Sequence, residues 1–418
     1  MFESSPPGSF PLCANPSFEP YAARQLRALV EEISHGIRDF RPLGVVLTGS
    51  LARGEAALAA GEDRRTRWLS DIECMVVFAD TSGKSRAPLN ESLGRAAAAL
   101  KAEAKVHAVG LDIQLVPILA SRLARLRSGI FTRELAEHGK LVWGSPGEVP
   151  IPLPEIADAG MLRADAFRLL NNRIMEQVAA RTGCEEGRAG AQERGYALSK
   201  FWTELATSMS VFLDCYRASY RERQRAMHAA FAAPHGPLVR ELAGDVVSRL
   251  DTAMQVRRGE FDPSHWPCEA GFEQAAGLAE RVWHWESSQM LALPAESAAG
   301  DWRVIPTRLR HIVTLSECAR DWLRWFLRPD VSRKMSVWRV GRVWRAGSPG
   351  NAIFAAGCLL DFFWNDIGSQ SARGQEILRL LRPLFGLRGR GRDGSPDRQR
   401  LVARAVTAWQ SHLRNAPL

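Results

Sequence analysis

The sequence predicts an α/β (α+β) protein in which a small mixed-sheet domain is followed by an all-α domain. Up to about residue 150, short apolar runs with strand character alternate with helical patterns, and beyond it the apolar residues follow helical spacing. Residues 146–154 hold four prolines and form the expected linker. We therefore expect a flexible N-terminus at 1–18, a mixed-sheet domain at 19–150 and a helical domain at 151–418.

Three apolar runs are the expected strands of the first domain. Residues 44–48 and 72–78 are rich in β-branched and aliphatic side chains, which is typical of buried strands. Residues 109–116 place apolar side chains at 111, 113 and 115 and polar ones between them. The intervening patterns predict helices at 21–40, 51–60 and 89–105 and a polar loop at 61–67.

Apolar side chains at helical spacing mark the helices of the second domain. The pattern is clearest at 167–178 and 198–212, where apolar residues recur every three or four positions. Similar periodicity predicts helices at 237–257, 272–293, 303–328 and 373–387, and a last helix at 399–414. We expect no strand in this half of the chain.

The composition narrows the class of protein. Hydrophobic residues make up 46% of the chain and charged residues 24%, which excludes a mostly disordered or low-complexity protein. Seven widely spaced cysteines without a C-x-x-C pair argue against a disulfide framework or a structural zinc site and fit a reducing cytosol. The N-terminus lacks a signal-peptide pattern, and the longest apolar run, 352–364, is too short to span a bilayer. These features predict a cytoplasmic protein without a membrane partner.

The charge allows an anionic partner but does not by itself favour nucleic acid. The formal net charge is +9, yet only six of the 55 basic residues are lysine, so a bias toward arginine explains much of it. Arg223 and His228 resemble the Arg-x4-His catalytic pair of HEPN ribonucleases, which would suit general acid–base cleavage of RNA. Such a pair arises easily by chance in an arginine-rich chain.

A Gly-Ser pair ends the first expected strand and opens a helix. Backbone N–H groups at such a turn are free to bind phosphate oxygens. Gly49 lets the backbone approach a ligand closely, and the Ser50 hydroxyl adds a donor. The pair therefore predicts a phosphate cradle.

Carboxylates open the next strand at positions i and i+2. Because side chains alternate along a strand, Asp71 and Glu73 are expected on one face, where they repel each other unless a cation lies between them. Mg²⁺, held by carboxylates and substrate phosphates, meets this need. Asp112 is polar within the third apolar run, where burial without a partner is costly. Singly, each carboxylate could cap a loop or face solvent, but together with the cradle they indicate a two-metal phosphoryl-transfer site.

These elements resemble the nucleotidyltransferase superfamily with the DNA polymerase β-type fold. Its signature is an apolar strand, Gly-Ser, Asp-x-[Asp/Glu] on the next strand and a third carboxylate on a later one. Residues 49–56 are closest to its minimal, aminoglycoside-adenylyltransferase-like branch, and the matching later elements are 70–73, 111–116 and the closing strand at 137–144. Two departures are a Ser50-to-Asp71 gap longer by roughly ten residues, which a surface loop tolerates, and Glu73 in place of Asp.

The resemblance implies a Mg²⁺-dependent nucleotidyltransferase that moves an NMP from an NTP, with ATP expected, to an acceptor hydroxyl and releases pyrophosphate. Asp71, Glu73 and Asp112 would be the catalytic metal ligands for two ions, with Asp112 a candidate base. Gly49 and Ser50 would hold the β- and γ-phosphates. Members of this family commonly reach a lysine from the helical domain to the triphosphate, and Lys200 is the candidate here, with an exposed helix lysine as the alternative interpretation.

Other interpretations remain open at this point. Arg53 and Glu55 are expected to close the turn rather than to react, and residues 171–173 could line the cleft. The acceptor is a small molecule, a protein or a nucleic acid. A low-turnover nucleotide-binding regulatory or antitoxin-like protein, or an enzyme that adds nucleotides to RNA ends, would carry the same motifs.

Overall fold

The structure is a computed structural model that describes most of the chain. The described residues are 9–60, 66–79, 91–95, 97–98, 113–123, 125–145, 147, 149, 159–187, 189–233, 237–294, 301–326, 347–369, 371–385, 387 and 394–413. Within them, a small sheet near the N-terminus is followed by helices, so the predicted mixed α/β class is confirmed. Described residues 9–145 are called the sheet lobe below, and described residues 159–413 the helical lobe.

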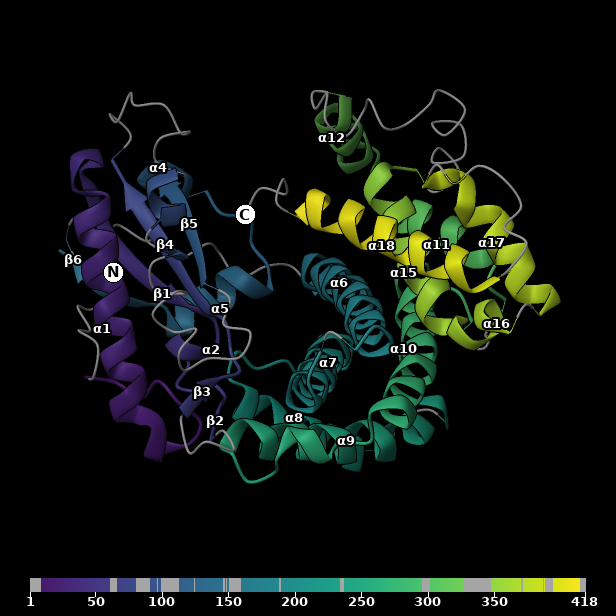
Figure 1. Cartoon of the computed structure of the whole chain (residues 1–418), viewed down its shortest axis with the longest axis horizontal. Coiled ribbons are helices and arrows are strands. Elements are labelled where there is room, and N and C mark those ends of the chain that lie inside the picture. The colour runs from purple at the N-terminus through teal and green to yellow at the C-terminus, as the bar shows by residue number, and fades with distance from the viewer. Residues whose placement is uncertain are drawn as a thin grey trace.

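Four strands form the main sheet, in the order β5-β4-β1-β6 (Figure 1). The central strand β1 runs antiparallel to β4 and β6, whereas β4 and β5 are parallel, which makes the sheet mixed. The expected strand at 72–78 is confirmed, and the closing strand is present as β6. The third expected strand, 109–116, is present as β5 over its described part, and residues 109–112 lie outside the described residues. The strands are β1 Pro42–Thr48, β4 Ile72–Phe78, β5 Ile113–Leu119 and β6 Lys140–Gly144.

The two faces of the sheet are covered by different helices. On β4, the side chains of Ile72, Cys74 and Val76 pack in a cluster with α1 (Glu19–Gly36). Met75 and Val77 face the other way and pack in a second cluster with Leu123 and Leu135, the latter from α5 (Ile130–His138). Because side chains alternate, Glu73 belongs to this second face, on the side of the sheet where α5 packs.

The helix expected at 51–60 is wrong. The structure has a single turn, α2 (Gly49–Ala52), followed by a hairpin of β2 (Leu58–Ala60) and β3 (Thr66–Trp68). Gly54, with φ +69°, takes the left-handed conformation that ends the turn. Leu58–Ala60 is rich in helix-forming alanine, but pairing with β3, which also takes part of the expected loop at 61–67, overrides that propensity.

The segment before α1 is packed rather than loose over its described part. Leu12 and Cys13 are buried, and their backbone N–H groups donate to Glu19 Oε1 at 2.7 and 2.8 Å. Ala56 N donates to the Leu12 carbonyl and Ala14 N to the Ala56 carbonyl. This segment therefore braces the chain just after α2; residues 1–8 lie outside the described part.

The helical lobe has one main hydrophobic core, around which its helices are arranged (Figure 1). No described residue from 159 onward is in a strand. The helix expected at 303–328 is two helices, because Thr314 and Glu317 form a capping box that starts the second. The helices are α6 Ala159–Glu185, α7 Ala191–Phe212, α8 Tyr220–Ala232, α9 Pro237–Arg258, α10 Cys268–Met290, α11 Val304–Ile312, α12 Leu315–Phe326, α15 Pro349–Phe362, α16 Trp364–Gly368, α17 Ala372–Leu384 and α18 Gly394–Leu413.

Helices α6, α7 and α8 of this lobe lie next to the sheet lobe. In Figure 1, α6 and α7 stand between the sheet and the outer helices, and α8 lies beside the hairpin of β2 and β3. Most of α7 is buried, and every side chain from Phe201 to Phe212 is buried. In the part of the chain that the structure describes, none of the helices has the length and apolar character needed to cross a membrane.

Candidate active site

The Gly-Ser turn lies at the end of the central strand. Gly49 has φ +67°, a backbone conformation that favours glycine, and α2 continues for one turn only. The predicted cradle is therefore a tight turn rather than the start of a long helix. Because no helical turn comes before α2, its first backbone N–H groups have no carbonyl partners within the helix.

Glu73 lies directly against this turn. Thr48 and Glu73 are partners in the β1–β4 register, and Thr48 Oγ1 donates to the Glu73 carbonyl at 3.2 Å. A Cβ atom on Gly49 would lie 2.6 Å from Glu73 Oε2, so any larger residue would collide with the carboxylate. Burial, together with the nearby Asp71 carboxylate, raises the pKa of Glu73.

Asp71 precedes β4 and meets a lysine from the other lobe. Lys200 Nζ on α7 lies 3.0 Å from Asp71 Oδ2 and 3.8 Å from Glu176 Oε2. Glu176 is also ion-paired with Arg173, one helical turn earlier on α6. Although burial opposes the charged form, Glu176 and Asp71 raise the pKa of Lys200. These five residues, Asp71, Glu73, Arg173, Glu176 and Lys200, are called the carboxylate–lysine cluster below.

A pocket opens beside this cluster. It has a volume of about 310 Å³ and lies between the start of β4, α6 and α7. Tyr196, on the pocket wall, lies with its hydroxyl 3.1 Å from Ser70 Oγ, and Ser70 Oγ accepts from Ala57 N at 2.8 Å. The lining residues are Leu69, Asp71, Arg173, Glu176, Gln177, Glu193, Tyr196, Ala197, Lys200 and Phe201. The pocket joins Asp71 to the helical lobe and is of a size that suits a small ligand.

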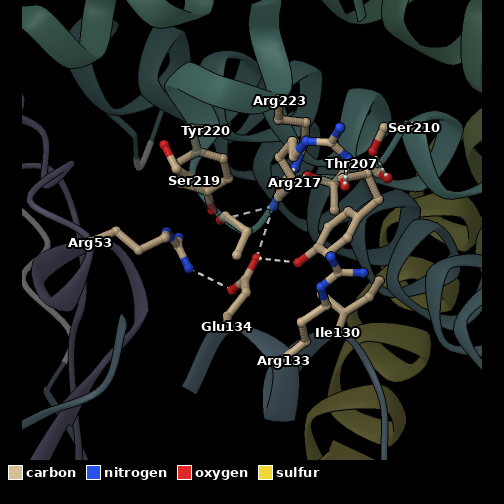
Figure 2. Close-up of polar contacts among 12 residues, drawn as sticks. Arg53, Ile130, Arg133, Glu134, Thr207, Ser210, Arg217, Ser219, Tyr220 and Arg223 are labelled. Carbon is tan, nitrogen blue, oxygen red and sulfur yellow. Dashed lines mark hydrogen bonds and ion pairs between the residues drawn. The ribbon is translucent and has the colours of Figure 1, made fainter. Parts of the chain in front are cut away.

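A second polar cluster joins the lobes on the far side of α2. Figure 2 shows Arg53 and Arg223 approaching the Glu134 carboxylate from the two lobes. The Tyr216 hydroxyl donates to Glu134 Oε1 at 3.0 Å, and Arg223 Nη2 donates to the same oxygen at 2.9 Å. We call this set, with Glu55 and Tyr220, the Glu134 network.

Glu55 anchors the start of α8. Its carboxylate accepts from Ser219 Oγ at 2.8 Å and from the backbone N–H groups of Tyr220 and Arg221, both at 2.9 Å. Burial alone would raise the pKa of Glu55, but Arg53 and these N–H groups hold it below its usual value. The expectation that Arg53 and Glu55 are structural fits these contacts, because both side chains are used within the protein.

The structure brings together most of the predicted site residues. Gly49, Glu73, Asp71 and Lys200 form a continuous region, and Ser50 follows Gly49 in the turn. Asp112, the third predicted carboxylate, lies outside the described residues, directly before Ile113, which pairs with Ile72 in the parallel β4–β5 register. Its contacts are therefore not part of the site described here.

Residues 171–173 divide between the core and the pocket. Asn171 donates to the Phe167 carbonyl and accepts from Trp283 Nε1, and Asn172 accepts from Trp409 Nε1. Only Arg173 lines the pocket. Sequence reasoning missed Glu176 and Tyr196, although the spacing of Glu176 from Arg173 places both on one face of a helix.

Arg223 and His228, which resemble the catalytic pair of HEPN ribonucleases, do not lie in a common site. Arg223 has an exposed fraction of 1% and is held within the Glu134 network. His228 Nε2 lies 2.8 Å from Asp251 Oδ1 near the surface of α8. Arg223 is thus a buried anchor and is not available to RNA.

The cluster has donor groups suited to a hard cation. Among the described residues, no three His, Cys, Asp or Glu side chains form a group that could hold a metal ion. Asp71 and Glu73 supply two carboxylates, and burial, together with the nearby Asp71 charge, raises the pKa of Glu73. Mg²⁺ bound by two carboxylates and by substrate oxygens fits this donor set.

Comparisons with known proteins give no relative on which to rest a function. No protein-family model, curated protein or solved structure matches this chain. A turn with unpaired N–H groups can bind an anion, and two carboxylates beside it can bind a divalent cation.

Proposed function

We propose that the protein is a Mg²⁺-dependent nucleotidyltransferase with the nucleotidyltransferase arrangement of the DNA polymerase β-type fold. It would transfer an NMP from an NTP, with ATP the first candidate, to an acceptor hydroxyl. The observation that carries the proposal is the contact between the Gly49 turn and Glu73, where a Cβ would lie 2.6 Å from the carboxylate. The proposed phosphate cradle and carboxylate pair would therefore form one site.

The reaction would break one bond and form one bond at phosphorus. The acceptor hydroxyl oxygen attacks the α-phosphorus, the bond to the β-phosphate oxygen breaks, and pyrophosphate leaves. Gly49 and Ser50 would bind the β- and γ-phosphates, which belong to the leaving group. Lys200 would supply positive charge to the triphosphate from the helical lobe.

Asp71 and Glu73 would hold Mg²⁺, and Asp112 is proposed as a third ligand and as the base that takes the hydroxyl proton. When bound, Mg²⁺ neutralises charge on the phosphates. The protein contributes mainly position and charge, since the turn, the carboxylates and Lys200 are supplied by rigid elements of both lobes. The pocket of about 310 Å³ beside Asp71 is the proposed place for the acceptor or the nucleoside.

The test is a labelling experiment with purified protein. The protein is incubated with Mg²⁺ and each labelled NTP in turn, and all labelled products, including the protein itself, are identified by mass spectrometry. We expect Mg²⁺-dependent release of pyrophosphate and a labelled acceptor. NTP binding without pyrophosphate release would instead indicate a nucleotide-binding regulatory protein, and label on added RNA would indicate an RNA-end enzyme whose RNA binding falls steeply with salt.

A further inference from the structure

Lys200 occupies the position beside Asp71 that a bound metal ion would take. Its Nζ atom lies 3.0 Å from Asp71 Oδ2, which is hydrogen-bonding distance, and 3.8 Å from Glu176 Oε2. The side chains of Lys200 and Asp71 are about three-quarters buried, with exposed fractions of 27% and 23%. The ammonium group is thus the cation that balances Asp71 in this structure.

A divalent cation and this ammonium group compete for the same carboxylate. Both need the negative charge of Asp71, and two cations at one carboxylate oxygen repel each other strongly in a partly buried site. Binding of a metal ion to Asp71 therefore requires Lys200 to move away. Removal of Lys200 without another cation would leave the Asp71 carboxylate, which lies near that of Glu73, without an ion-pair partner among the described residues.

The surroundings offer Lys200 a second position. Glu176 remains within 3.8 Å on the α6 side, and its own ion pair with Arg173 keeps it in place. Lys200 and Asp71 both line the pocket, and Glu73, two residues after Asp71, lies against the Gly49 turn that is proposed to hold the phosphates. A triphosphate would supply the negative charge that Lys200 loses on leaving Asp71.

We propose that Lys200 is the resident counter-cation of Asp71 and is exchanged for a divalent cation when a nucleoside triphosphate binds, so that metal and nucleotide bind cooperatively. The inference rests on the proposed function, since it takes the ligands from it. Metal alone has to displace Lys200 and binds weakly. Nucleotide draws Lys200 away and so strengthens metal binding, and by linkage the metal strengthens nucleotide binding to the same extent.

The test measures metal and nucleotide binding separately, without turnover. Mn²⁺ binding is followed by electron paramagnetic resonance in the wild type, Lys200→Met and the control Lys140→Met, whose lysine lies on β6 over the Phe10 ring. We expect Lys200→Met to bind Mn²⁺ about tenfold more tightly than the wild type and to bind ATP in EDTA about tenfold more weakly. Lys200→Arg keeps the cation and should bind Mn²⁺ as the wild type does, as should Lys140→Met.

Stability gives a second measurement on the same proteins. Without the lysine, the carboxylates repel one another, so Mg²⁺ should raise the melting temperature of Lys200→Met more than that of the wild type. Lys200→Gln serves as a polar second variant if methionine disturbs the fold. A smaller Mg²⁺ effect in both variants would contradict the exchange.

The outcomes separate this inference from the proposed function. Equal Mn²⁺ affinity in wild type and Lys200→Met, lost in Asp71→Asn, would overturn the exchange and leave the metal site standing. Tighter Mn²⁺ binding in Lys200→Met, together with a wild-type protein that transfers no nucleotide, would support the exchange and overturn the transferase function. No Mn²⁺ binding in either protein, with or without ATP, would overturn both.

Discussion

The carboxylate–lysine cluster and the Glu134 network both join the sheet lobe to the helical lobe, but they differ in how completely their charges are paired. In the Glu134 network, Glu134 accepts from Arg53, Arg223 and Tyr216, and Glu55 accepts from three donors of the α8 start. In the carboxylate–lysine cluster, Asp71 and Glu73 lie beside each other, and burial with Asp71 raises the pKa of Glu73.

The difference distinguishes a structural cluster, the Glu134 network, from a candidate functional site, the carboxylate–lysine cluster. A buried ion network whose members all have partners is expected to hold elements in place. A carboxylate pair whose charge is only partly balanced, beside a pocket, is a candidate site for a bound cation. Arg53 and Glu55 of the Glu134 network follow the Gly49 turn, and Glu73 of the carboxylate–lysine cluster lies against it, so an anchor and a candidate site meet at this turn.

The largest expected effect tests the cluster that is assigned a function. Asp71→Asn should lower nucleotide transfer by about 100-fold or more, the scale of losing a main electrostatic group of an active site. The fold should persist, because Asp71 contacts Lys200 at the pocket and not the core. Mg²⁺-dependent pyrophosphate release and thermal melting by circular dichroism measure the two properties. Asp214→Asn, at an exposed aspartate with a 71% exposed side chain, is the control.

Wild-type turnover in Asp71→Asn, with metal still required, would contradict the assignment of Asp71 as a metal ligand. Loss of the folded state in this variant would instead mean that the two clusters do not differ as described. In that case Asp71 would have to be grouped with Glu134 as a structural anchor.

The next effect tests the anchor. Glu134→Gln should lower the free energy of unfolding by about 3 kcal/mol, because it leaves Arg53 and Arg223 buried without their shared carboxylate. Denaturation in urea measures the change. Glu137→Gln, one turn later on α5 and half-exposed in an ion pair with Arg133, should change stability by less than about 0.5 kcal/mol. Equal changes in both variants would show that the network contributes nothing specific.

The third prediction concerns the cradle between the two clusters. Ser50→Ala should weaken NTP binding by about 1.5–3 kcal/mol, the range for a hydrogen bond to a charged group. Ser50→Val should weaken it severely, because the branched side chain would block the turn. Calorimetric titration with NTP and with the bare nucleoside measures both losses. If nucleoside binding falls as much as NTP binding, Ser50 shapes the fold and does not hold phosphate.

The smallest expected effect depends on pH. Burial opposes the charge of Glu204, but Arg173, Arg223 and the Tyr220 hydroxyl lower its pKa to about 2. A carboxylate with a lowered pKa stabilises the fold above its ordinary pKa, and this contribution is lost as pH falls toward the pKa of the folded state. Glu204→Gln should therefore cost on the order of 1–2 kcal/mol at pH 7, and the difference from the wild type should shrink between pH 4.5 and pH 2.

Urea denaturation at several pH values tests this prediction. The control is again Glu137→Gln, whose half-exposed carboxylate is ion-paired on the surface of α5 and should change the free energy of unfolding by less than about 0.5 kcal/mol. A constant difference for Glu204→Gln across the range would show that its charge is not stabilised by the two arginines.

Local patterns predicted the parts of the fold that local forces decide. The strand Ile72–Phe78 is a short, mostly apolar run of the kind that forms buried strands. Alternation correctly places Glu73 on the face of the sheet opposite to that of Ile72 and Cys74. The hairpin was missed because Leu58–Ala60 has the composition of a helix. Its partner Thr66–Trp68, and not its own propensity, determines its structure.

The site shows the same division. The Gly49 turn and the carboxylate pair could be predicted, since each depends on neighbours in the sequence. Lys200 meets Asp71 across 129 residues, so only a resemblance to a family suggested it, and nothing suggested Glu176 as its second partner. The roles of Arg53 and Glu55 as anchors of α8 likewise depend on a helix that begins at Tyr220.

The bond between Glu55 and the start of α8 also bears on how such a protein can be recombined. A chimera that joins this sheet lobe to a different helical half would bury Arg53 and Glu134 against a surface lacking Tyr216, Ser219 and Arg223. The replacement helical half would have to supply equivalent hydrogen-bond donors at the same junction. Exchange of helical halves is therefore restricted to partners that preserve the contacts of this junction.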